Sequence, residues 1–240
     1  MKFSQESAGV DMIGIIGAMS VEVENLIAVM TDKSTQTISE VVYYSGKIEN
    51  IDCVVAKCGV GKVASAICAQ TMILNYHPGA VINVGVAGGI GENIHIGDIV
   101  VSSGLVQHDM DTTAIGDEKG LISGLNIVIV PASSRLVDLV VSTAKQIYGQ
   151  GVHVGVIATG DQFISSGDRL KEIAREFGAS ACEMEGGSIA QVCYINHVDF
   201  VVIRAISDNA NEAANIDFAA FAISSAHKTA ELIMKILPSI

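Results

Sequence analysis

Residues 200–207 read FVVIRAIS and form the most hydrophobic strand-like stretch of the chain. Continuous β-branched residues without polar alternation are typical of a strand that is covered on both faces. Residues 80–86 (AVINVGV) and 54–57 (VVAK) follow the same pattern. Amphipathic or Ala-rich segments lie between such runs, so strands and helices alternate along the chain. This alternation predicts an α/β fold, a three-layer α/β/α sandwich around a central mixed, mainly parallel sheet.

The expected elements run from residue 12 to the C-terminal end of the sequence. No Pro/Ser-rich linker, charge run or internal repeat divides them, so we expect a single domain over residues 12–240 after a polar tail at 1–11. Residues 109–124 form the longest stretch without periodicity, and loops of that length are often functional. Strands are expected at 12–17, 41–48, 51–58, 80–86, 98–108, 152–159, 179–183 and 200–207, and helices at 21–30, 62–75, 134–148, 168–177, 186–195 and 216–237.

Composition excludes several classes of function. The 240 residues include 14 Lys and Arg against 26 Asp and Glu, a formal charge of −12, which disfavours nucleic acids and anionic membranes as partners. The five cysteines include no CxxC pair, so we expect reduced thiols rather than disulfides or a zinc site. Residues 1–11 lack a hydrophobic signal region and no apolar run reaches membrane-spanning length. We therefore expect a cytoplasmic protein.

The ends of the predicted strands are where a ligand should bind. In open parallel sheets, ligands lie at the carboxyl ends of the strands, where the chain leaves the sheet. In this sequence those ends are rich in glycine and in acidic residues. They fall at 17–19, 58–61, 85–89, 159–163, 183–185 and 207–208.

Glycine-rich and metal-like motifs at these ends leave several alternatives open. Residues 59–64 (GVGKVA) match the dinucleotide fingerprint, but residues 80–84 lack the acidic residue that would hold the ribose. Residues 85–89 (GVAGG) are no P-loop, because no Gly-Lys-Ser/Thr closes them. Their glycines either permit a tight turn or leave bare backbone on which a flat ligand could lie. The run from His108 to Asp111 has too few hard ligands without a second cluster, so we expect no metal.

Four acidic residues stand out at or just after the strand ends. Glu183 and Glu185 follow an apolar strand, and Arg204 on another apolar strand is their natural counter-ion. Asp208 ends the most hydrophobic strand, where an Asp is often only a helix cap, but no helix signal follows at once. Glu22 lies in the first turn of a predicted helix, where the helix dipole favours an acid in any case.

Taken together, these strand ends resemble the 5′-methylthioadenosine/S-adenosylhomocysteine nucleosidases, a family within the purine nucleoside phosphorylase superfamily. The resemblance extends from about residue 12 to the C-terminal helix and lies in several motifs that occur in the same order. It implies a nucleoside phosphorylase-like fold. The motifs are IGIIGAM (13–19) with Glu22, GVGK (59–62), NVGVAGG (83–89), His108-Asp109, TGDQFI (159–164), EME (183–185) and RAISD (204–208).

The resemblance implies hydrolysis of the N-ribosidic bond of 5′-methylthioadenosine and S-adenosylhomocysteine, with 5′-deoxyadenosine as a further substrate. Asp208 would be the general acid that protonates adenine N7, and Ser207 would orient it. Glu22 would accept a proton from the attacking water, near Arg204 and Glu185. No cofactor and no metal are implied.

The same resemblance assigns the substrate contacts. Glu185 would bind the ribose hydroxyls, with Met184 packed against the sugar, while Phe163 stacks on the adenine and the backbone of Ile164 reads its edge. The family is homodimeric, and residues 109–124 of a second subunit would complete the 5′ side of the pocket. The full set of expected substrate-binding residues is Met19, Val60, Val86, Ala87, Gly88, Phe163, Ile164, Glu183, Met184, Glu185, Arg204, Ser207 and Phe218.

Three alternatives remain at this stage. A nucleoside phosphorylase would need two or more cations around the phosphate, yet every arginine except Arg204 lies in a predicted helix. A non-catalytic nucleoside-binding protein would have lost Glu22 or Asp208, and both are present. An aminofutalosine-type hydrolase of the same fold differs mainly at the 5′ side, where Met19, Val60 and Phe218 favour a thioether.

Overall fold

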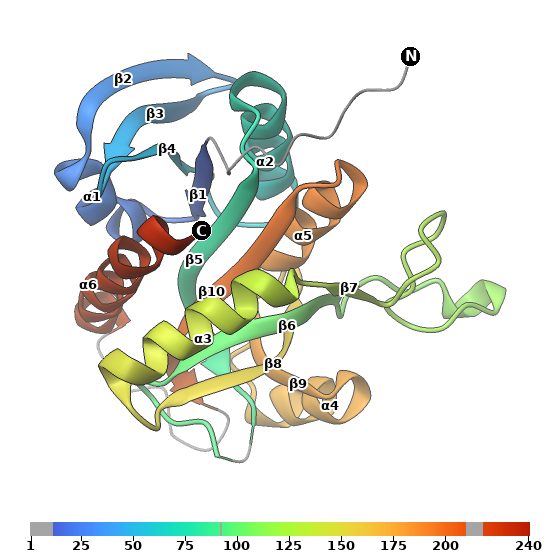
Figure 1. The fold of residues 1–240 in the computed structure, drawn as a ribbon. Helices are drawn as coiled ribbons and strands as arrows, with labels where there is room; N and C mark the ends of the chain where they lie inside the picture. Colours follow the sequence, from blue (N-terminus) through green and yellow to red (C-terminus); the bar gives the residue numbers. More distant parts are fainter. Residues whose placement is uncertain (1–11, 92, 210–217) are drawn as a thin grey trace.

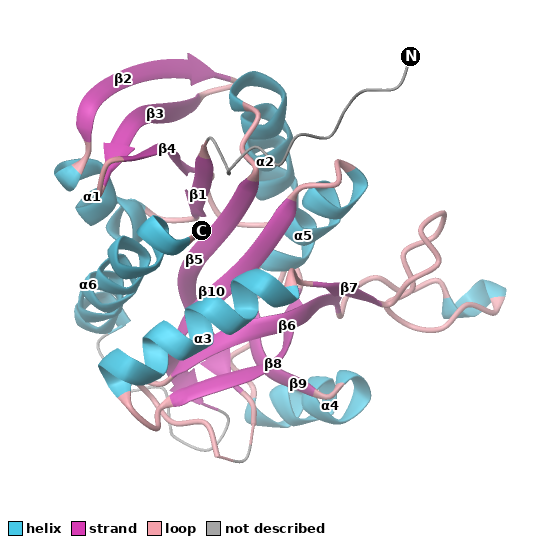
Figure 2. Ribbon diagram, viewed as in Figure 1, coloured by secondary structure: helices cyan, strands magenta, loops and turns pink. Residues whose placement is uncertain are grey.

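The computed structural model describes residues 12–91, 93–209 and 218–240, and leaves the side chains of 209 and 218–222 outside that description. Within these residues, ten strands form one mixed sheet and six α-helices pack around it (Figures 1 and 2). The strands are β1 (Ile13–Gly17), β2 (Thr31–Ile38), β3 (Val41–Ile48), β4 (Ile51–Lys57), β5 (Ala80–Gly89), β6 (Ile99–Gln107), β7 (Ile129–Pro131), β8 (Val152–Thr159), β9 (Ala179–Glu183) and β10 (Asp199–Asn209).

The helices pack on both sides of the sheet. On one side, α1, α3 and α6 bury residues such as Leu26, Leu136 and Ile233 in one hydrophobic cluster, and on the other α2 and α5 bury Met72 and Ile189 in a second. Helix α4 covers β8 and β9. The predicted helices are all observed, with ends that differ by at most two residues within the described chain. They are α1 (Ser20–Val29), α2 (Lys62–Tyr76), α3 (Ser134–Tyr148), α4 (Gly167–Phe177), α5 (Gly186–Ile195) and α6 (Phe218–Ile236).

The sheet is not the simple open layer that a sandwich implies. Its order is β10-β6-β8-β9-β5-β1-β4-β3-β2, and β10 also pairs with β5, so β5, β9, β8, β6 and β10 close into a five-stranded ring. The expectation of a nucleoside phosphorylase-like α/β fold with a mixed sheet holds, but the description as a simple three-layer sandwich was wrong, because part of the sheet is closed.

Ring closure depends on a segment that the sequence presented as a turn. Strand β5 was expected to end at residue 86, yet it continues to Gly89. Gly88 and Gly89 pair antiparallel with β9, and the same residues pair in parallel with β10, which has a register shift between Ile206 and Asp208. Such bulges bend a strand and increase its twist. The glycine-rich end of β5 is therefore part of the sheet and joins the two strands that complete the ring.

Two strands were not expected from the sequence. In β2 every residue except the last, Ile38, is polar, and none is buried, so the strand shows no apolar periodicity. It is held in place by antiparallel pairing with β3. The other, β7, has only three residues and pairs with β6. Between β6 and β7 the chain projects from the body of the molecule as an arm, residues 109–128 (Figure 1). No helix among the described residues is long and apolar enough to span a membrane.

Candidate active site

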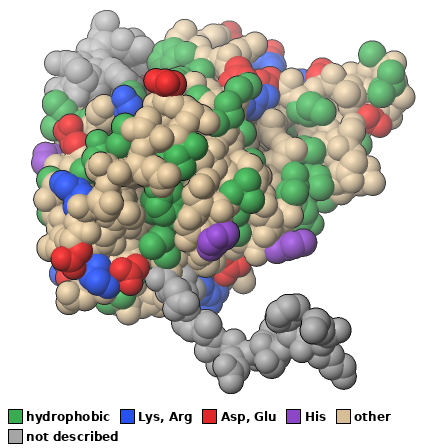
Figure 3. All heavy atoms as spheres, turned by 90° about the horizontal axis from the view of Figure 1, so that it is seen from above, with side chains coloured by type: hydrophobic (Ala, Val, Ile, Leu, Met, Phe, Trp, Pro, Cys, Tyr) green, Lys and Arg blue, Asp and Glu red, His purple; other side chains and the backbone are tan. Residues whose placement is uncertain are grey.

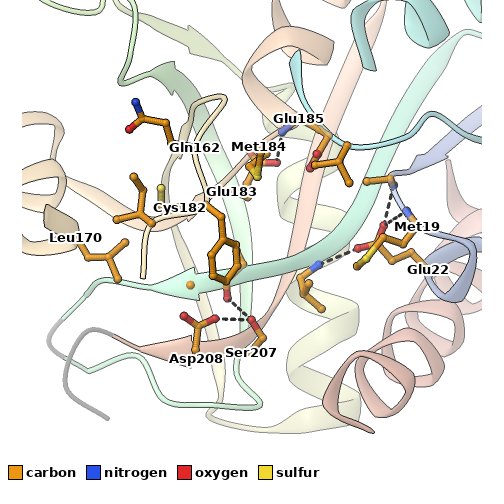
Figure 4. A pocket seen from close by; sticks show the side chains of 17 residues that line it. Met19, Glu22, Gln162, Leu170, Cys182, Glu183, Met184, Glu185, Ser207 and Asp208 are labelled. Atoms are coloured by element: carbon orange, nitrogen blue, oxygen red, sulfur yellow. Dashed lines mark hydrogen bonds between the residues drawn. The ribbon is translucent and has the colours of Figure 1, made fainter. Parts of the chain in front are cut away.

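A cavity of about 260 Å³ opens at the carboxyl ends of β1, β5, β9 and β10 (Figure 4). Met19 and Glu22 lie toward one end of it, Ser207 and Asp208 toward the other, and Met184 and Glu185 between them. The strand ends chosen from the sequence thus meet around one cavity. Its lining is Ala18, Met19, Glu22, Val60, Val86, Ala87, Gly88, Gln162, Phe163, Ile164, Leu170, Cys182, Glu183, Met184, Glu185, Ser207 and Asp208.

Glu22 is held by backbone amides at the start of α1. Its Oε2 accepts hydrogen bonds from the N–H groups of Ala18 (2.7 Å) and Met19 (2.9 Å), and its Oε1 accepts one from Val86 (3.3 Å). Burial raises the pKa of this carboxyl, while the three N–H donors and the nearby Arg204 charge act in the opposite direction. Glu22 lies in the first turn of α1, as expected, and the same side chain also faces the cavity.

Glycines of β5 make room for the acidic side chains. A Cβ at Gly85 would lie 2.8 Å from Glu22 Oε1 and 3.4 Å from the Arg204 guanidinium, and a Cβ at Gly88 would lie 3.4 Å from Asp208 Oδ2. Because real Cβ atoms essentially never approach within 3.0 Å, Gly85 is required by the position of Glu22. The absence of side chains at Gly85 and Gly88 therefore leaves room for the carboxylates of Glu22 and Asp208, and it also leaves uncovered backbone on which a flat ligand could lie.

Asp208 lies at the end of β10, next to the buried hydroxyl of Ser207. The Ser207 Oγ is 2.6 Å from Asp208 Oδ1 and 3.3 Å from the carbonyl oxygen of Ala87. The neighbouring hydroxyl fixes the orientation of the carboxyl group. Residues 201–207 of β10 are buried, whereas Asp208 is half-buried and lines the cavity.

Glu185 is the N-cap residue of α5 and accepts a hydrogen bond from the Gly61 N–H (2.8 Å) at the start of α2. Burial and the neighbouring charge of Glu183 raise the pKa of Glu185 to about 7, although Arg204 and the Gly61 amide oppose the change. Its second carboxylate oxygen is not engaged by any hydrogen bond within the described chain. That oxygen is available to a ligand hydroxyl in the cavity.

Glu183 and Glu185 diverge because β9 ends at Glu183. Glu183 accepts hydrogen bonds from the Thr159 hydroxyl, from the backbone N–H of Glu185 (3.0 Å) and Gly186 (2.7 Å), and from the guanidinium of Arg204. Arg204 also donates to the side-chain oxygen of Asn83, 2.5 Å away. The expected role of Arg204 as counter-ion is confirmed, since it forms a buried salt bridge with Glu183.

Arg204 is not among the residues that line the cavity, although it was expected to bind substrate and to lie near the attacking water. Its side chain is 1% exposed and lies behind Glu183 and Glu22. Long apolar strands on either side bury it completely, and its partners draw the guanidinium toward Asn83. Its charge acts on the carboxylates that do line the cavity.

The other residues expected to contact substrate line the cavity, apart from one whose side chain is not described. Val60 and Phe163 line the cavity and are largely exposed, Phe163 by 71%. Ile164 and Met184 also line it. The side chain of Phe218 lies outside the described residues.

Four lining residues were not identified from the sequence: Ala18, Gln162, Leu170 and Cys182. Three of them adjoin residues that were, so their neighbours were a usable signal. Leu170 comes from α4, and an apolar residue on an amphipathic helix gives no indication that it faces a cavity. Among the described residues, no group of three or more His, Cys, Asp or Glu could hold a metal ion.

Comparison with known proteins identifies the family. Residues 12–238 match the family model described as "Phosphorylase superfamily". The chain is 43% identical over 226 residues to the 5′-methylthioadenosine/S-adenosylhomocysteine nucleosidase of Shewanella oneidensis, covering 94% of this chain and 95% of that one. This chain belongs to the 5′-methylthioadenosine/S-adenosylhomocysteine nucleosidase family. The resemblance in the strand-end motifs is thereby confirmed.

Solved structures of the nucleosidase family share the fold. The nucleosidase of Neisseria meningitidis in complex with methylthio-immucillin-A matches with a TM-score of 0.91 and 32% identity, over 96% of this chain and all of that one. A mutant futalosine hydrolase of Helicobacter pylori matches with a TM-score of 0.90 and 35% identity, over 96% of this chain and all of that one. The closed ring and the surrounding helices therefore belong to the family architecture.

Proposed function

We propose that this chain hydrolyses the N-ribosidic bond of 5′-methylthioadenosine and S-adenosylhomocysteine, and also of 5′-deoxyadenosine, to adenine and the corresponding ribose. The observation that carries the proposal is that Glu22 and Asp208 line one cavity from opposite ends, with Glu185 between them (Figure 4). A nucleoside placed along the cavity would present its base to Asp208 and its sugar to Glu22 and Glu185. The names of the relatives support this substrate class.

Each acid has a separate task in this proposal. Asp208, oriented by Ser207, donates a proton to adenine N7, so the base leaves as a neutral molecule; such general-acid assistance is worth about 10²–10⁴ in rate. Glu22 accepts a proton from the water that attacks the sugar carbon. Glu185 accepts hydrogen bonds from the ribose hydroxyls, and its negative charge stabilises the cationic character that develops on the sugar.

Water rather than phosphate fits the cavity as the nucleophile. No Lys or Arg is among its described lining residues, whereas a phosphate dianion normally takes two or more cations. Arg204 is buried outside the cavity lining, and its guanidinium is already paired with Glu183. A carboxylate at Glu22 would repel phosphate.

The test follows adenine and sugar products chromatographically during incubation with methylthioadenosine, S-adenosylhomocysteine, 5′-deoxyadenosine, adenosine or inosine, with and without phosphate. We expect adenine and free thioribose from the two thioethers at a rate independent of phosphate. Formation of a sugar 1-phosphate would assign the chain to the phosphorylases instead. In Asp208→Asn, adenine release should fall by at least about 10²-fold while nucleoside binding persists; wild-type turnover would refute the role of Asp208.

Aminofutalosine hydrolysis is the second candidate activity, because the futalosine hydrolase of Helicobacter pylori is as similar to this chain as the nucleosidases are. Met19 and Val60 at the cavity favour an apolar 5′ substituent such as a thioether. Adding aminofutalosine to the same substrate series compares the two directly. A higher kcat/KM for aminofutalosine than for methylthioadenosine would make it the main substrate.

We propose further that the chain forms a homodimer in which residues 109–124 complete the partner's pocket. Ile115, on the projecting arm, is 80% exposed, and α2, which begins two residues after the cavity residue Val60, carries exposed Val63, Ile67 and Leu74. Figure 3 shows hydrophobic side chains across the face seen from above, and more on the part that projects at the right. Light scattering should give a mass of two chains. A monomer with full activity would refute the shared pocket.

Two further expectations remain proposals. We propose that residues 12–240 act as one domain, because all the described strands join one sheet. The cytoplasm is the proposed compartment, since all five cysteines are free and buried, as in a protein that does not rely on disulfides.

A further inference from the structure

Three segments that follow strands are joined by a small polar network, formed by Lys62, Asp109 and Asp161. Two of these segments contribute Val60 and residues 162–164 to the cavity lining. Lys62 Nζ lies 2.6 Å from Asp109 Oδ1, and the other oxygen of Asp109 accepts the backbone N–H of Asp161 at 2.8 Å. The Asp161 carboxylate in turn accepts the backbone N–H of Lys62 at 2.8 Å. The three residues follow β4, β6 and β8, so their hydrogen bonds link segments that are far apart in the chain.

The network is bonded directly to the start of α2, where two carboxylates meet successive amides. The Lys62 N–H binds Asp161, while the preceding Gly61 N–H binds Glu185, the residue proposed to hold the ribose. Gly61 has a φ of +98°, and a Cβ there would lie 3.0 Å from Asp161 Oδ1. Glycine is therefore needed for Glu185 and Asp161 to approach the same turn.

The other end of the network leads to the base side of the cavity. Asp161 immediately precedes residues 162–164, which line the cavity and include Phe163. Both its backbone and its side chain are bonded to neighbouring loops, so the position at which residues 162–164 leave the body is fixed. Glu185, which is proposed to bind the ribose, and Asp161, which precedes the segment proposed to contact the base, therefore both accept hydrogen bonds from residues 61–62 at the start of α2.

The ion pair in this network is better shielded than the other lysine pairs on the surface. The side chains of Lys62 and Asp109 are 19% and 20% exposed, against 38% and 49% for Lys47 and Asp52. Burial alone would raise the pKa of Asp109, but the bonds from Lys62 and from the Asp161 amide lower it below its usual value. A partly buried, charge-assisted pair of this kind is worth more than an exposed one.

We propose that Lys62, Asp109 and Asp161 are positioning residues that set the separation between Glu185 and residues 162–164, and so determine substrate affinity. The inference rests on the proposed function, because it assigns the ribose to Glu185 and the base to Phe163. None of the three residues lines the cavity, so they act through those that do. Because stacking of the base on Phe163 and the hydrogen bonds of the ribose hydroxyls already form in the ground state, loss of the network should affect KM more than kcat.

The test compares Lys62→Met with wild type, with Lys62→Arg as the conservative variant and Lys47→Met as the matched control. We expect Lys62→Met to raise KM for methylthioadenosine about ten-fold with kcat within about three-fold, in line with a charged hydrogen bond. Lys62→Arg should recover most of the affinity, and Lys47→Met should have wild-type KM. Combining Lys62→Met with Asp109→Asn should be no worse than Lys62→Met alone, because both remove the same unit.

Calorimetric titration with adenine gives a second measurement that does not need turnover. The Kd for adenine should rise about ten-fold in Lys62→Met, because residues 162–164 are displaced, while the thermal midpoint stays close to that of Lys47→Met. A wild-type KM and adenine Kd in Lys62→Met, or an equal defect in Lys62→Arg, would overturn the positioning role. If wild-type protein releases no adenine from any nucleoside, the proposed function fails, and the adenine titration still decides whether the network positions residues 162–164.

Discussion

Replacing Glu185 by Gln should change how the stability of the protein depends on pH. Burial and the charge of Glu183 raise the pKa of Glu185 from 4.5 to about 7 in the folded state. Between these values the unfolded chain is ionised at this position while the folded protein still holds the proton. The free energy of unfolding therefore falls as pH rises through this interval and levels off above pH 7. At about 1.4 kcal/mol per pKa unit, the full loss is about 3 kcal/mol.

Glutamine cannot ionise, so Glu185→Gln removes this part of the pH dependence. Urea unfolding of both proteins at pH 5, 6, 7 and 8 gives the difference in unfolding free energy at each pH. That difference should move in favour of the variant by about 2–3 kcal/mol between pH 5 and pH 8. Glu24→Gln, at an exposed position of α1, is the control and should run parallel to wild type. A constant difference for Glu185→Gln, or one that moves in favour of wild type, would refute the reasoning.

Three other substitutions test the site. Gly85→Ala should lower kcat for adenine release at least about ten-fold, because its Cβ would lie 2.8 Å from Glu22 Oε1 and displace that carboxylate; unchanged kcat would contradict this reading. Glu183→Gln leaves the guanidinium of Arg204 buried without its counter-charge, so the free energy of unfolding in urea should fall by about 3–5 kcal/mol, and a loss below about 1 kcal/mol would be inconsistent with it. Glu22→Gln should reduce kcat by about 10²–10⁴-fold while methylthioadenosine still binds, as measured by calorimetry; retention of turnover would remove Glu22 from the role of base.

The sequence predicted the elements of the fold better than their closure. Strands such as β1 and β10 are buried on both faces, so their apolar runs mark them directly. Strand β2 escaped prediction because its side chains are in solvent and only its backbone pairing makes it a strand. The ring depends on the final residues of β5, where glycines resemble a turn until their partners in β9 and β10 are known.

For the site, the strand-end rule located the cavity but not each contact within it. Glu22, Glu185 and Asp208 follow strands whose apolar runs are clear, and they meet as the rule requires. The position of Arg204 could not be inferred, because a strand that is buried on both faces has no polar alternation to show which face meets the cavity. Leu170 was missed because its contribution depends on how α4 packs over β8 and β9.

The polar character of β2 has a consequence beyond its own pairing. Each strand of the ring pairs with a neighbour on both sides, whereas β2 pairs only with β3. Among the described strands, β2 therefore has the longest unpaired edge. Its residues TDKSTQTI place Asp32 and Lys33 along that edge, and every residue but the last is exposed. Charged and hydrophilic side chains on an outer strand discourage another chain from docking there. The least hydrophobic strand of the protein thus limits uncontrolled growth of the sheet into aggregates.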